Sequence, residues 1–243
     1  MNKALILAAG VSRRLYPLTY DTPKTLLSLG DQRIIDYQIQ ALEKARILDC
    51  VVITGYYRER LERYLLTHYP EVRFQFIVNH HFFETNTAYS VRLAQEAFQN
   101  QETMVLMNAD VLFPPDLLFR VLEAPTPTTL AVDIKPCGTE EVKVIEGGDQ
   151  RIVAIGKKLI EENALGEFIG VAKLAPDFVQ QFFRSLDHLI EAGGDADYFE
   201  AALHPLLKDH SVHYVNVSDF PCLEIDFAED LEQARQLARE WPE

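Results

Sequence analysis

The chain has 243 residues, of which 48% are hydrophobic and 25% charged, and its formal net charge at pH 7 is -14. These proportions are typical of a globular protein that can bury a sizeable core. The excess of acidic groups argues against a protein that grips nucleic acid or an anionic membrane through a broad basic face. A small anionic ligand stays compatible with this charge, because it needs only a few local cations.

The cysteines and the N-terminal segment indicate a cytoplasmic protein. The three cysteines are dispersed without a CxxC pair, which predicts reduced thiols; they are Cys50, Cys137 and Cys222. The apolar stretch after Lys3 is short for a signal peptide, and Arg13 and Arg14 stand where a cleavage site needs small residues. No apolar run approaches transmembrane length, so we expect no membrane partner.

The first half of the chain alternates apolar, β-type runs with amphipathic helical patterns. Strands are predicted at residues 3–9, 50–56, 72–78 and 103–109. Helices are predicted at residues 33–45, 58–69, 85–99 and 115–124. Repeated strand–helix units indicate an α/β fold with a doubly wound, Rossmann-like, mainly parallel sheet. Because the strand runs are nearly continuous in apolar residues, both faces of the sheet should be buried.

After about Pro125 the pattern becomes rich in β-type segments. Strand-like segments lie at 128–135, 142–157, 166–174 and 212–217. A hairpin is predicted inside the second of these, at Gly147-Gly148-Asp149. Helices are predicted at 176–192 and 197–209, and residues 223–240 read as a short strand followed by a closing helix. No repeat or linker divides the chain, so we expect a single domain, 1–243, with a β-rich insertion in a mixed sheet.

The segment after the first strand is irregular and basic. Gly10 has no Cβ, so a ligand can approach its backbone closely. Arg14 can donate to two phosphate oxygens at once, and Lys24 supplies a second cation. Pro17 and Pro23 restrict the loop and lower the entropy that it loses on closing over a ligand. These features suit a polyphosphate, although glycine and proline alone would equally suit a solvated turn.

The same segment carries an ordered set of motifs. They are Leu7-Ala8-Ala9-Gly10, Arg14-Leu15, Pro17-Leu18-Thr19 and Pro23-Lys24. In this order they resemble the signature of the nucleotidyltransferase superfamily, which is far more specific than a lone glycine motif. Ser12 stands where many members have a second glycine, and its hydroxyl can donate to a phosphate. The resemblance implies a fold of the glycosyltransferase-A type, catalytic roles for Arg14 and Lys24, and a nucleotide site formed by Leu7, Ala8, Ala9, Gly10, Ser12, Arg14 and Lys24.

Two aspartates follow predicted strands. Asp110 comes directly after the strand at 103–109, and Asp226 follows a short strand near the C-terminus. A lone Asp at such a place usually caps the next helix. Together with the opening loop, the two resemble the family's magnesium-binding aspartates, and two carboxylates plus phosphate oxygens suffice for Mg²⁺. Asp230 is interpreted as an ordinary acid at the start of the closing helix.

Later segments resemble the phosphocholine and aminoethylphosphonate cytidylyltransferase group. The matching segments are 79–94, 141–159, 166–174, 197–203 and 223–234. By this resemblance Asn86 and Ser90 lie near the nucleotide, and Lys143 near the acceptor phosphate, with an outward-facing strand lysine as its alternative. A cationic acceptor amine suits aromatic faces and carboxylates. The candidates at matching positions are Glu167, Phe168, Tyr198 and Glu200, whereas Phe199, also at a matching position, is expected in the core.

The resemblance implies a transferase that uses Mg²⁺ to move CMP from CTP onto a phosphorylated small alcohol or phosphonate and releases pyrophosphate. Residues 1–125 are then the nucleotide-binding half, and residues 126–243 the acceptor-side half with the closing helix. One alternative is a sugar-1-phosphate nucleotidyltransferase, since the opening loop and both aspartates are shared across the superfamily. A nucleotide-sensing homologue without turnover is a second, although such proteins usually lose a metal ligand or the loop lysine. A metal-dependent glycosyltransferase of similar sheet topology is a third, but it would not need the basic loop.

Overall fold

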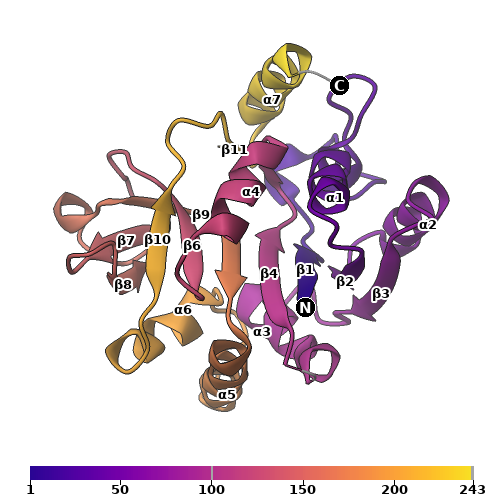
Figure 1. Cartoon of the computed structure of the whole chain (residues 1–243). Helices are drawn as coiled ribbons and strands as arrows, with labels where there is room; N and C mark the ends of the chain where they lie inside the picture. The colour runs from indigo at the N-terminus through magenta and orange to yellow at the C-terminus, as the bar shows by residue number, and fades with distance from the viewer. Residues whose placement is uncertain (100, 242–243) are drawn as a thin grey trace.

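A computed structural model describes residues 1–99 and 101–241, in which helices cover both faces of a nine-stranded mixed sheet (Figure 1). The strands are β1 (Asn2–Ala8), β2 (Asp49–Thr54), β3 (Arg73–Val78), β4 (Thr103–Asn108), β5 (Val111–Leu112), β6 (Thr129–Asp133), β7 (Lys143–Glu146), β8 (Ile152–Gly156), β9 (Gly166–Leu174), β10 (His213–Asn216) and β11 (Leu223–Glu224). The helices are α1 (Ile34–Lys44), α2 (Arg58–His68), α3 (Thr87–Leu93), α4 (Pro115–Glu123), α5 (Pro176–Glu191), α6 (Glu200–Leu203) and α7 (Ala228–Glu240).

The strand order across the sheet is β10-β6-β9-β4-β1-β2-β3, which Figure 1 shows from left to right. β1 pairs in parallel with β2 and β4, β2 with β3, and β6 with β10. β9 runs antiparallel to both β4 and β6, and the β7–β8 hairpin extends from it. The predicted fold class, a doubly wound and mainly parallel mixed sheet with a β-rich insertion, is confirmed.

Two helix predictions differ from the structure in length. The helix expected at 85–99 divides into α3 and a 3₁₀ turn at Gln95–Phe98. The helix expected at 197–209 is α-helical only in α6 and continues as a 3₁₀ helix at His204–Lys208. Pro205 explains the second difference, because proline has no N–H to donate within an α-helix. The two-residue strand β5 was not predicted, and it forms a separate antiparallel ladder with β11.

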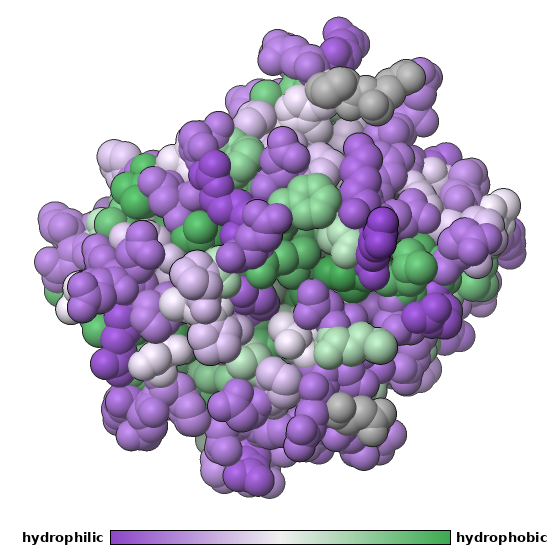
Figure 2. Space-filling view, in the orientation of Figure 1, coloured by the Kyte–Doolittle hydropathy of each residue, from purple (hydrophilic) through white to green (hydrophobic). Residues whose placement is uncertain are grey.

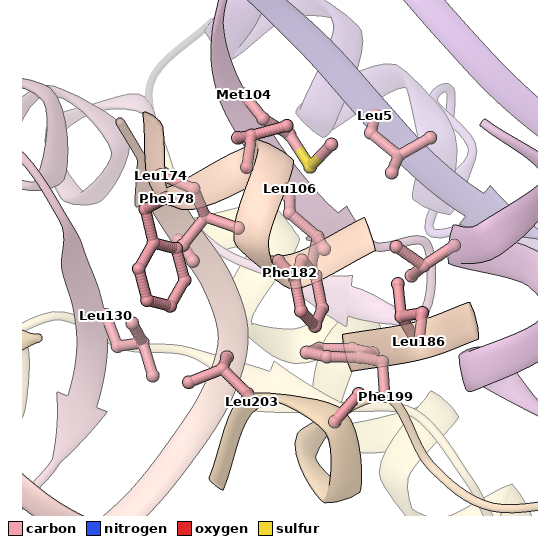
Figure 3. Packing of buried hydrophobic residues seen from close by; sticks show 14 of the residues in the cluster. Leu5, Met104, Leu106, Leu130, Leu174, Phe178, Phe182, Leu186, Phe199 and Leu203 are labelled. Carbon is pink, nitrogen blue, oxygen red and sulfur yellow. The ribbon is translucent and has the colours of Figure 1, made fainter. Parts of the chain in front are cut away.

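Alternate residues of the central strands face two separate cores. Leu5 belongs to the core under α3, α5 and α6, whereas Ile6 belongs to the core under α1, α2 and α4. In Figure 3 the rings of Phe178 and Phe182 on α5 point into the first core, Phe178 toward Leu130 and Phe182 toward Leu106 of β4. Two-sided burial explains why the strands are continuous apolar runs in the sequence.

The surface is mainly hydrophilic in the view of Figure 2, where hydrophobic residues gather in a band across the middle of this face. Within residues 1–99 and 101–241, no helix combines the length and the apolar character that crossing a membrane requires.

The parallel pairing of β1 with β4 places two functional loops at one edge of the sheet. Leu7 of β1 lies opposite Asn108 of β4 in the ladder. The segment after β1 and the segment that carries Asp110 therefore leave the sheet side by side. Open α/β sheets bind their ligands at this edge, beyond the carboxyl ends of the strands.

Candidate active site

A cavity of about 380 Å³ opens at the carboxyl ends of β1 and β4. Most of the side chains predicted to bind substrate or metal line it. They are Leu7, Ala8, Ala9, Gly10, Ser12, Arg14, Lys24, Asn86, Ser90, Asp110, Tyr198, Glu200 and Asp226. Residues separated by more than 200 positions in the sequence therefore share one space, as the opening-loop hypothesis requires.

The opening loop is folded back on itself by hydrogen bonds. Ser12 has a left-handed backbone, with φ 52° and ψ 52°, and its carbonyl accepts a hydrogen bond from Thr19 Oγ1 at 3.1 Å. Glycine is favoured in this conformation, which explains physically why a glycine would suit this position. A Cβ added to Gly10 would meet no atom within 4 Å, so packing does not demand glycine there. The free space beside Gly10 belongs to the cavity that it lines.

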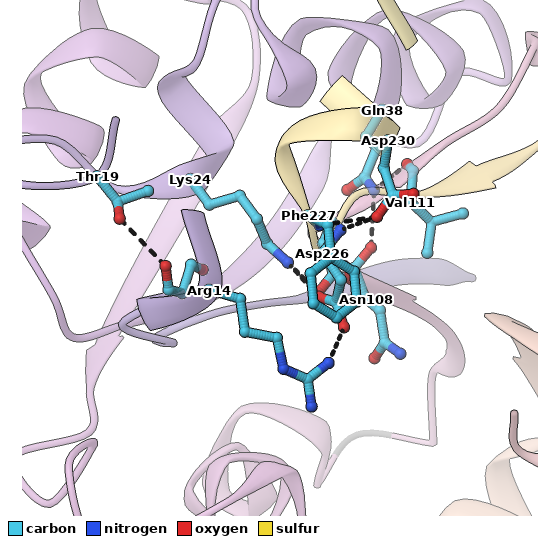
Figure 4. A network of polar contacts seen from close by, with 11 residues as sticks. Arg14, Thr19, Lys24, Gln38, Asn108, Val111, Asp226, Phe227 and Asp230 are labelled. Carbon is cyan, nitrogen blue, oxygen red and sulfur yellow. Dashed lines mark hydrogen bonds and ion pairs between the residues drawn. The ribbon is translucent and has the colours of Figure 1, made fainter. Parts of the chain in front are cut away.

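Lys24 joins the opening loop to both predicted metal ligands, and Figure 4 shows its side chain reaching toward Asp226. Its Nζ lies 2.9 Å from Asp110 Oδ2 and 3.0 Å from Asp226 Oδ1. Arg14 Nη1 lies 2.9 Å from Asp226 Oδ2. Burial alone would lower the pKa of Lys24, but the two carboxylates outweigh it and the pKa is raised. Burial likewise opposes the ionised form of Asp226, yet Lys24 and Arg14 leave its pKa below the ordinary value.

The β5–β11 ladder brings the two aspartates together. In it Glu224 lies opposite Val111, and Ile225 N donates to Asp110 O at 3.0 Å. Buried Gln38 of α1 supports the same turn, because its Nε2 donates to Asn108 O at 2.8 Å and to Val111 O at 2.9 Å. Two hydrogen bonds from one amide thus hold the backbone on either side of Asp110.

The side chain of Asp226 does not cap the helix that follows it. The N-terminal cap of α7 is provided by Asp230, whose Oδ2 accepts hydrogen bonds from Asp226 N at 2.9 Å and Phe227 N at 2.7 Å. The carboxylate of Asp226 faces the two basic side chains instead. The interpretation of Asp230 as a helix-terminal acid agrees with these contacts.

A third acidic side chain, Glu224, was not predicted from the sequence. Asp110, Glu224 and Asp226 each offer a carboxylate oxygen, and these oxygens lie within 4.8 Å of one another. Desolvation of its carboxyl group, reinforced by the charges of the other two, raises the pKa of Glu224 to about 8. The only sequence signal for it was its spacing of two residues from Asp226, which places both on one side of a short strand.

The three carboxylates suit a hard divalent cation such as Mg²⁺. Such an ion prefers oxygen ligands and retains several waters. Asp110 Oδ1 is buried and has no hydrogen-bond partner among the described residues, so a ligand position is free on it. The donor set and this unpartnered oxygen therefore fit the metal that the sequence led us to expect.

The beginning of α3 forms another wall of the cavity. Asn86 is the N-cap of α3 and accepts a hydrogen bond from Thr87 N, while Ser90 lies one turn further on. Asn79, which the sequence did not single out, is buried and donates to Ser90 Oγ at 3.2 Å and Thr85 Oγ1 at 3.0 Å. Its role as the hub of this wall depends on contacts between β3 and α3 that no local pattern reveals.

Lys157, Tyr198 and Glu200 lie together on another part of the cavity lining. Lys157 Nζ lies 4.6 Å from the centroid of the Tyr198 ring. Glu200 is 3% exposed, and burial raises its pKa to about 7 although its own backbone N–H and Lys157 act in the opposite direction. Lys157 was missed because two adjacent lysines after a strand resemble any solvated strand end.

Two predicted acceptor residues lie outside the main cavity. Lys143 is 1% exposed, and its Nζ donates to Lys157 O at 2.6 Å and to Glu141 O at 3.3 Å. Glu167 pairs with Lys135 at 2.7 Å and lines a neighbouring cavity of about 240 Å³. The side chain of Lys143 therefore neither faces outward nor lines the cavity, which were the two expectations from the sequence. Its ammonium group holds the backbone of Lys157 instead.

Comparisons with known proteins agree with this arrangement. The sequence profile of the family described as "Nucleotidyl transferase" matches residues 3–128. The chain is 26% identical to the CTP:phosphoglutamine cytidylyltransferase of Campylobacter jejuni, over 94% of this chain and 97% of that protein. It is also 26% identical to the choline-phosphate cytidylyltransferase of Streptococcus pneumoniae, over 98% of each.

A solved structure shares the fold over nearly the whole length. The CTP:phosphocholine cytidylyltransferase of Streptococcus pneumoniae superimposes with a TM-score of 0.80 at 25% identity, covering 98% of this chain and 99% of the other. The family profile spans the half that contributes the opening loop and Asp110 to the cavity. The chain belongs to the nucleotidyl transferase family, and it is a nucleotidyltransferase.

Proposed function

We propose that the protein transfers CMP from CTP onto a small phosphorylated alcohol or a phosphonate that carries an amine, and that it requires Mg²⁺. The observation that carries this proposal is the meeting of Lys24, Asp110 and Asp226 at one point of one cavity. The choice of CTP and of this acceptor class is supported by likeness to cytidylyltransferases over almost the whole chain.

The nucleotide is assigned to the wall formed by the opening loop and α3. Arg14 and Lys24 provide two cations for a triphosphate in a chain whose net charge is -14. Hydrogen bonds to charged groups contribute roughly 1.5–3 kcal/mol each, so these two side chains account for much of a micromolar affinity. Asn86 and Ser90 lie on the same cavity wall and are assigned to the nucleoside.

The metal is assigned to Asp110, Glu224 and Asp226. When bound, Mg²⁺ supplies positive charge that stabilises the phosphate oxygens of the donor and of the acceptor. Lys24, which pairs with two of these carboxylates, can serve the same phosphates from its present position in the cavity.

The reaction is an in-line displacement at phosphorus. An oxygen of the acceptor phosphate forms a bond to the α-phosphorus of CTP. The bond from that phosphorus to the oxygen that bridges it to the β-phosphorus breaks, and this oxygen leaves as part of pyrophosphate. Arg14 and Lys24 stabilise the negative charge that develops on the leaving pyrophosphate. A phosphate acceptor is already ionised at neutral pH, so the step needs no general base. The rate enhancement depends mainly on the positioning of the two substrates and on the neutralisation of their phosphate charges.

The acceptor is assigned to the wall of Lys157, Tyr198 and Glu200. Lys157 offers a cation for the acceptor phosphate, while Tyr198 and Glu200 offer an aromatic ring and a carboxyl group for a cationic amine. Lys143 supports this wall from beneath through the carbonyl of Lys157.

A substrate panel tests the proposal. Purified protein is assayed for pyrophosphate release with each of CTP, UTP, GTP and dTTP, in the presence of Mg²⁺ or EDTA. Each nucleotide is combined with phosphocholine, phosphoethanolamine, aminoethylphosphonate, inositol phosphate or glucose 1-phosphate. We expect turnover with CTP and an amine-bearing acceptor, and none in EDTA. Turnover confined to dTTP or GTP with the sugar phosphate would replace our proposal by NDP-sugar synthesis.

A further inference from the structure

Glu200 is fixed at the acceptor wall by the core beneath it. Its neighbour Phe199 is 1% exposed, and Figure 3 shows the Phe199 ring among the side chains of α5 and the sheet. Phe199 N also donates to Thr87 Oγ1 at 3.0 Å, which ties the start of α6 to α3. Because α6 is held from two sides, Glu200 cannot leave the wall of the cavity without disturbing the core.

The carboxyl group of Glu200 is incompletely satisfied. Its Oε2 is buried and has no hydrogen-bond partner among the described residues. Asp36, another buried acid, shows what full satisfaction is like: it accepts hydrogen bonds from Tyr64 Oη at 2.9 Å, Tyr69 Oη at 2.7 Å and Arg33 N at 2.7 Å. Buried carboxyl oxygens rarely stay without a donor, so the unpartnered oxygen at a cavity wall indicates a donor that arrives with a ligand.

The aromatic part of this wall is poorly suited to a quaternary ammonium group. Such a group binds by packing its methyl groups against open aromatic faces. The Tyr198 ring already has Lys157 Nζ at 4.6 Å from its centroid. The other aromatic residues of the described cavity lining are Phe168, which is 3% exposed and packs edge-on against Phe199, and Phe82, which packs against Tyr56 and Phe83.

We infer that Glu200 makes the enzyme select acceptors whose amine retains N–H bonds, a primary ammonium above all, over acceptors with a trimethylammonium group. An N–H of a primary ammonium can donate to Oε2 and satisfy it, and its positive charge pairs with the carboxylate. A trimethylammonium group has no N–H. When it packs against the same oxygen, Oε2 stays buried without a hydrogen-bond donor. This inference rests on the proposed function and narrows its acceptor class.

A methylation series of one acceptor tests the inference. The rate of pyrophosphate release with CTP and Mg²⁺ is measured for phosphoethanolamine, its N-methyl and N,N-dimethyl derivatives, phosphocholine, and n-propyl phosphate, which has no amine. We expect kcat/KM to fall by at least tenfold from the primary to the quaternary amine, because each methyl removes an N–H donor. n-Propyl phosphate should be used at least as poorly as phosphocholine.

Variants of Glu200 test whether this residue causes the preference for primary over quaternary amines. We call the fall of kcat/KM from the primary to the quaternary amine the slope of the series. Glu200→Gln should reduce this fall to about threefold or less while leaving the KM for CTP unchanged. Glu200→Asp should restore part of the slope. The control is Glu167→Gln: Glu167 already pairs with Lys135, so this variant should keep the full slope. A thermal melt of Glu200→Gln that is no lower than that of the parent, with the retained KM for CTP, shows that the variant is folded.

The outcomes separate the inference from the proposed function. Equal or better use of phosphocholine by the parent enzyme overturns the inference while the cytidylyltransferase function stands. A slope that survives in Glu200→Gln but is lost in Glu167→Gln moves the amine site to the neighbouring cavity and also overturns it. Turnover of sugar phosphates with no amine-bearing acceptor used removes the proposed acceptor class, and the inference with it.

Discussion

The sides of the cavity that we assign to the nucleotide and to the acceptor differ in how their charges are satisfied. On the nucleotide side, Lys24 pairs with Asp110 and Asp226, and Arg14 pairs with Asp226. Asp110 Oδ1 has no partner among the described residues and is left for the proposed metal. On the proposed acceptor side, Glu200 forms no ion pair among the described residues, and its Oε2 is unpartnered as well. The first region thus holds its side chains in place by mutual ion pairs before substrate arrives, whereas the carboxyl group of the second has no cation paired with it until a ligand supplies one. This division agrees with our proposal that Glu200 selects the acceptor.

The comparison predicts that removing a nucleotide-side acid has the largest effect. Asp110→Ala removes one of three clustered carboxylates and one partner of Lys24. We expect kcat to fall by roughly 10²-fold or more, because charge stabilisation of this kind carries the displacement. Pyrophosphate release under saturating substrates measures it.

The matched control is Asp116→Ala, which removes an exposed acid from the first turn of α4. It should retain the parent rate. An Asp110→Ala variant that is equally active would show that Asp110 has no part in the chemistry, and the distinction drawn here between the two sides would fail.

Loss of the acceptor-side cation should have a narrower effect. Lys157→Met removes a lysine that lines the cavity, and a lost charged hydrogen bond costs roughly 1.5–3 kcal/mol. We therefore expect the KM for the acceptor to rise about 10- to 100-fold with little change in the KM for CTP. Initial rates in which each substrate is varied in turn separate the two constants.

Lys158→Met is the control for this change, because it removes the same charge from the adjacent, exposed position. Its acceptor KM should stay close to that of the parent. If both variants behave alike, Lys157 acts through the general charge of the loop, and its assignment to the acceptor phosphate is wrong.

The last predicted effect concerns stability and not the rate, and it depends on pH. Burial raises the pKa of Glu200 to about 7, whereas in the unfolded chain the group ionises near its ordinary value of about 4.3. Between these two values the native state holds a proton that the unfolded state has lost, so stability falls as the pH rises. Glutamine does not ionise, so Glu200→Gln should avoid this loss of stability. Its free energy of unfolding should exceed that of the parent by on the order of 2–3 kcal/mol at pH 8.

Urea titrations at pH 5, 6, 7 and 8 measure this difference, which should shrink as the pH falls toward 4.5. Glu191→Gln, at the exposed end of α5, should show no such trend. A difference for Glu200→Gln that is constant over the whole range would mean that the carboxyl group ionises alike in the folded and unfolded states.

The fold and most of the cavity lining could be predicted because they depend on local patterns. Continuous apolar runs such as residues 103–109 fix a strand that is buried on both faces, and the polar residue at its end, Asp110, then lies at the binding edge. The opening loop was predicted as well, because its ordered motifs form one contiguous segment. In these cases neighbours in the sequence are also neighbours in space.

The remaining features were decided by contacts between distant segments. Glu224 joins the acidic cluster only because β11 pairs with β5, and two-residue strands leave almost no pattern in a sequence. Lys143 and Lys157 lie on the same hairpin, yet only packing decides which ammonium reaches the cavity and which is buried against backbone carbonyls. The sequence by itself determined the architecture and the edge of the sheet that binds ligands. Tertiary structure decided which charges meet there, because burial and pairing depend on elements that the chain brings together only when folded.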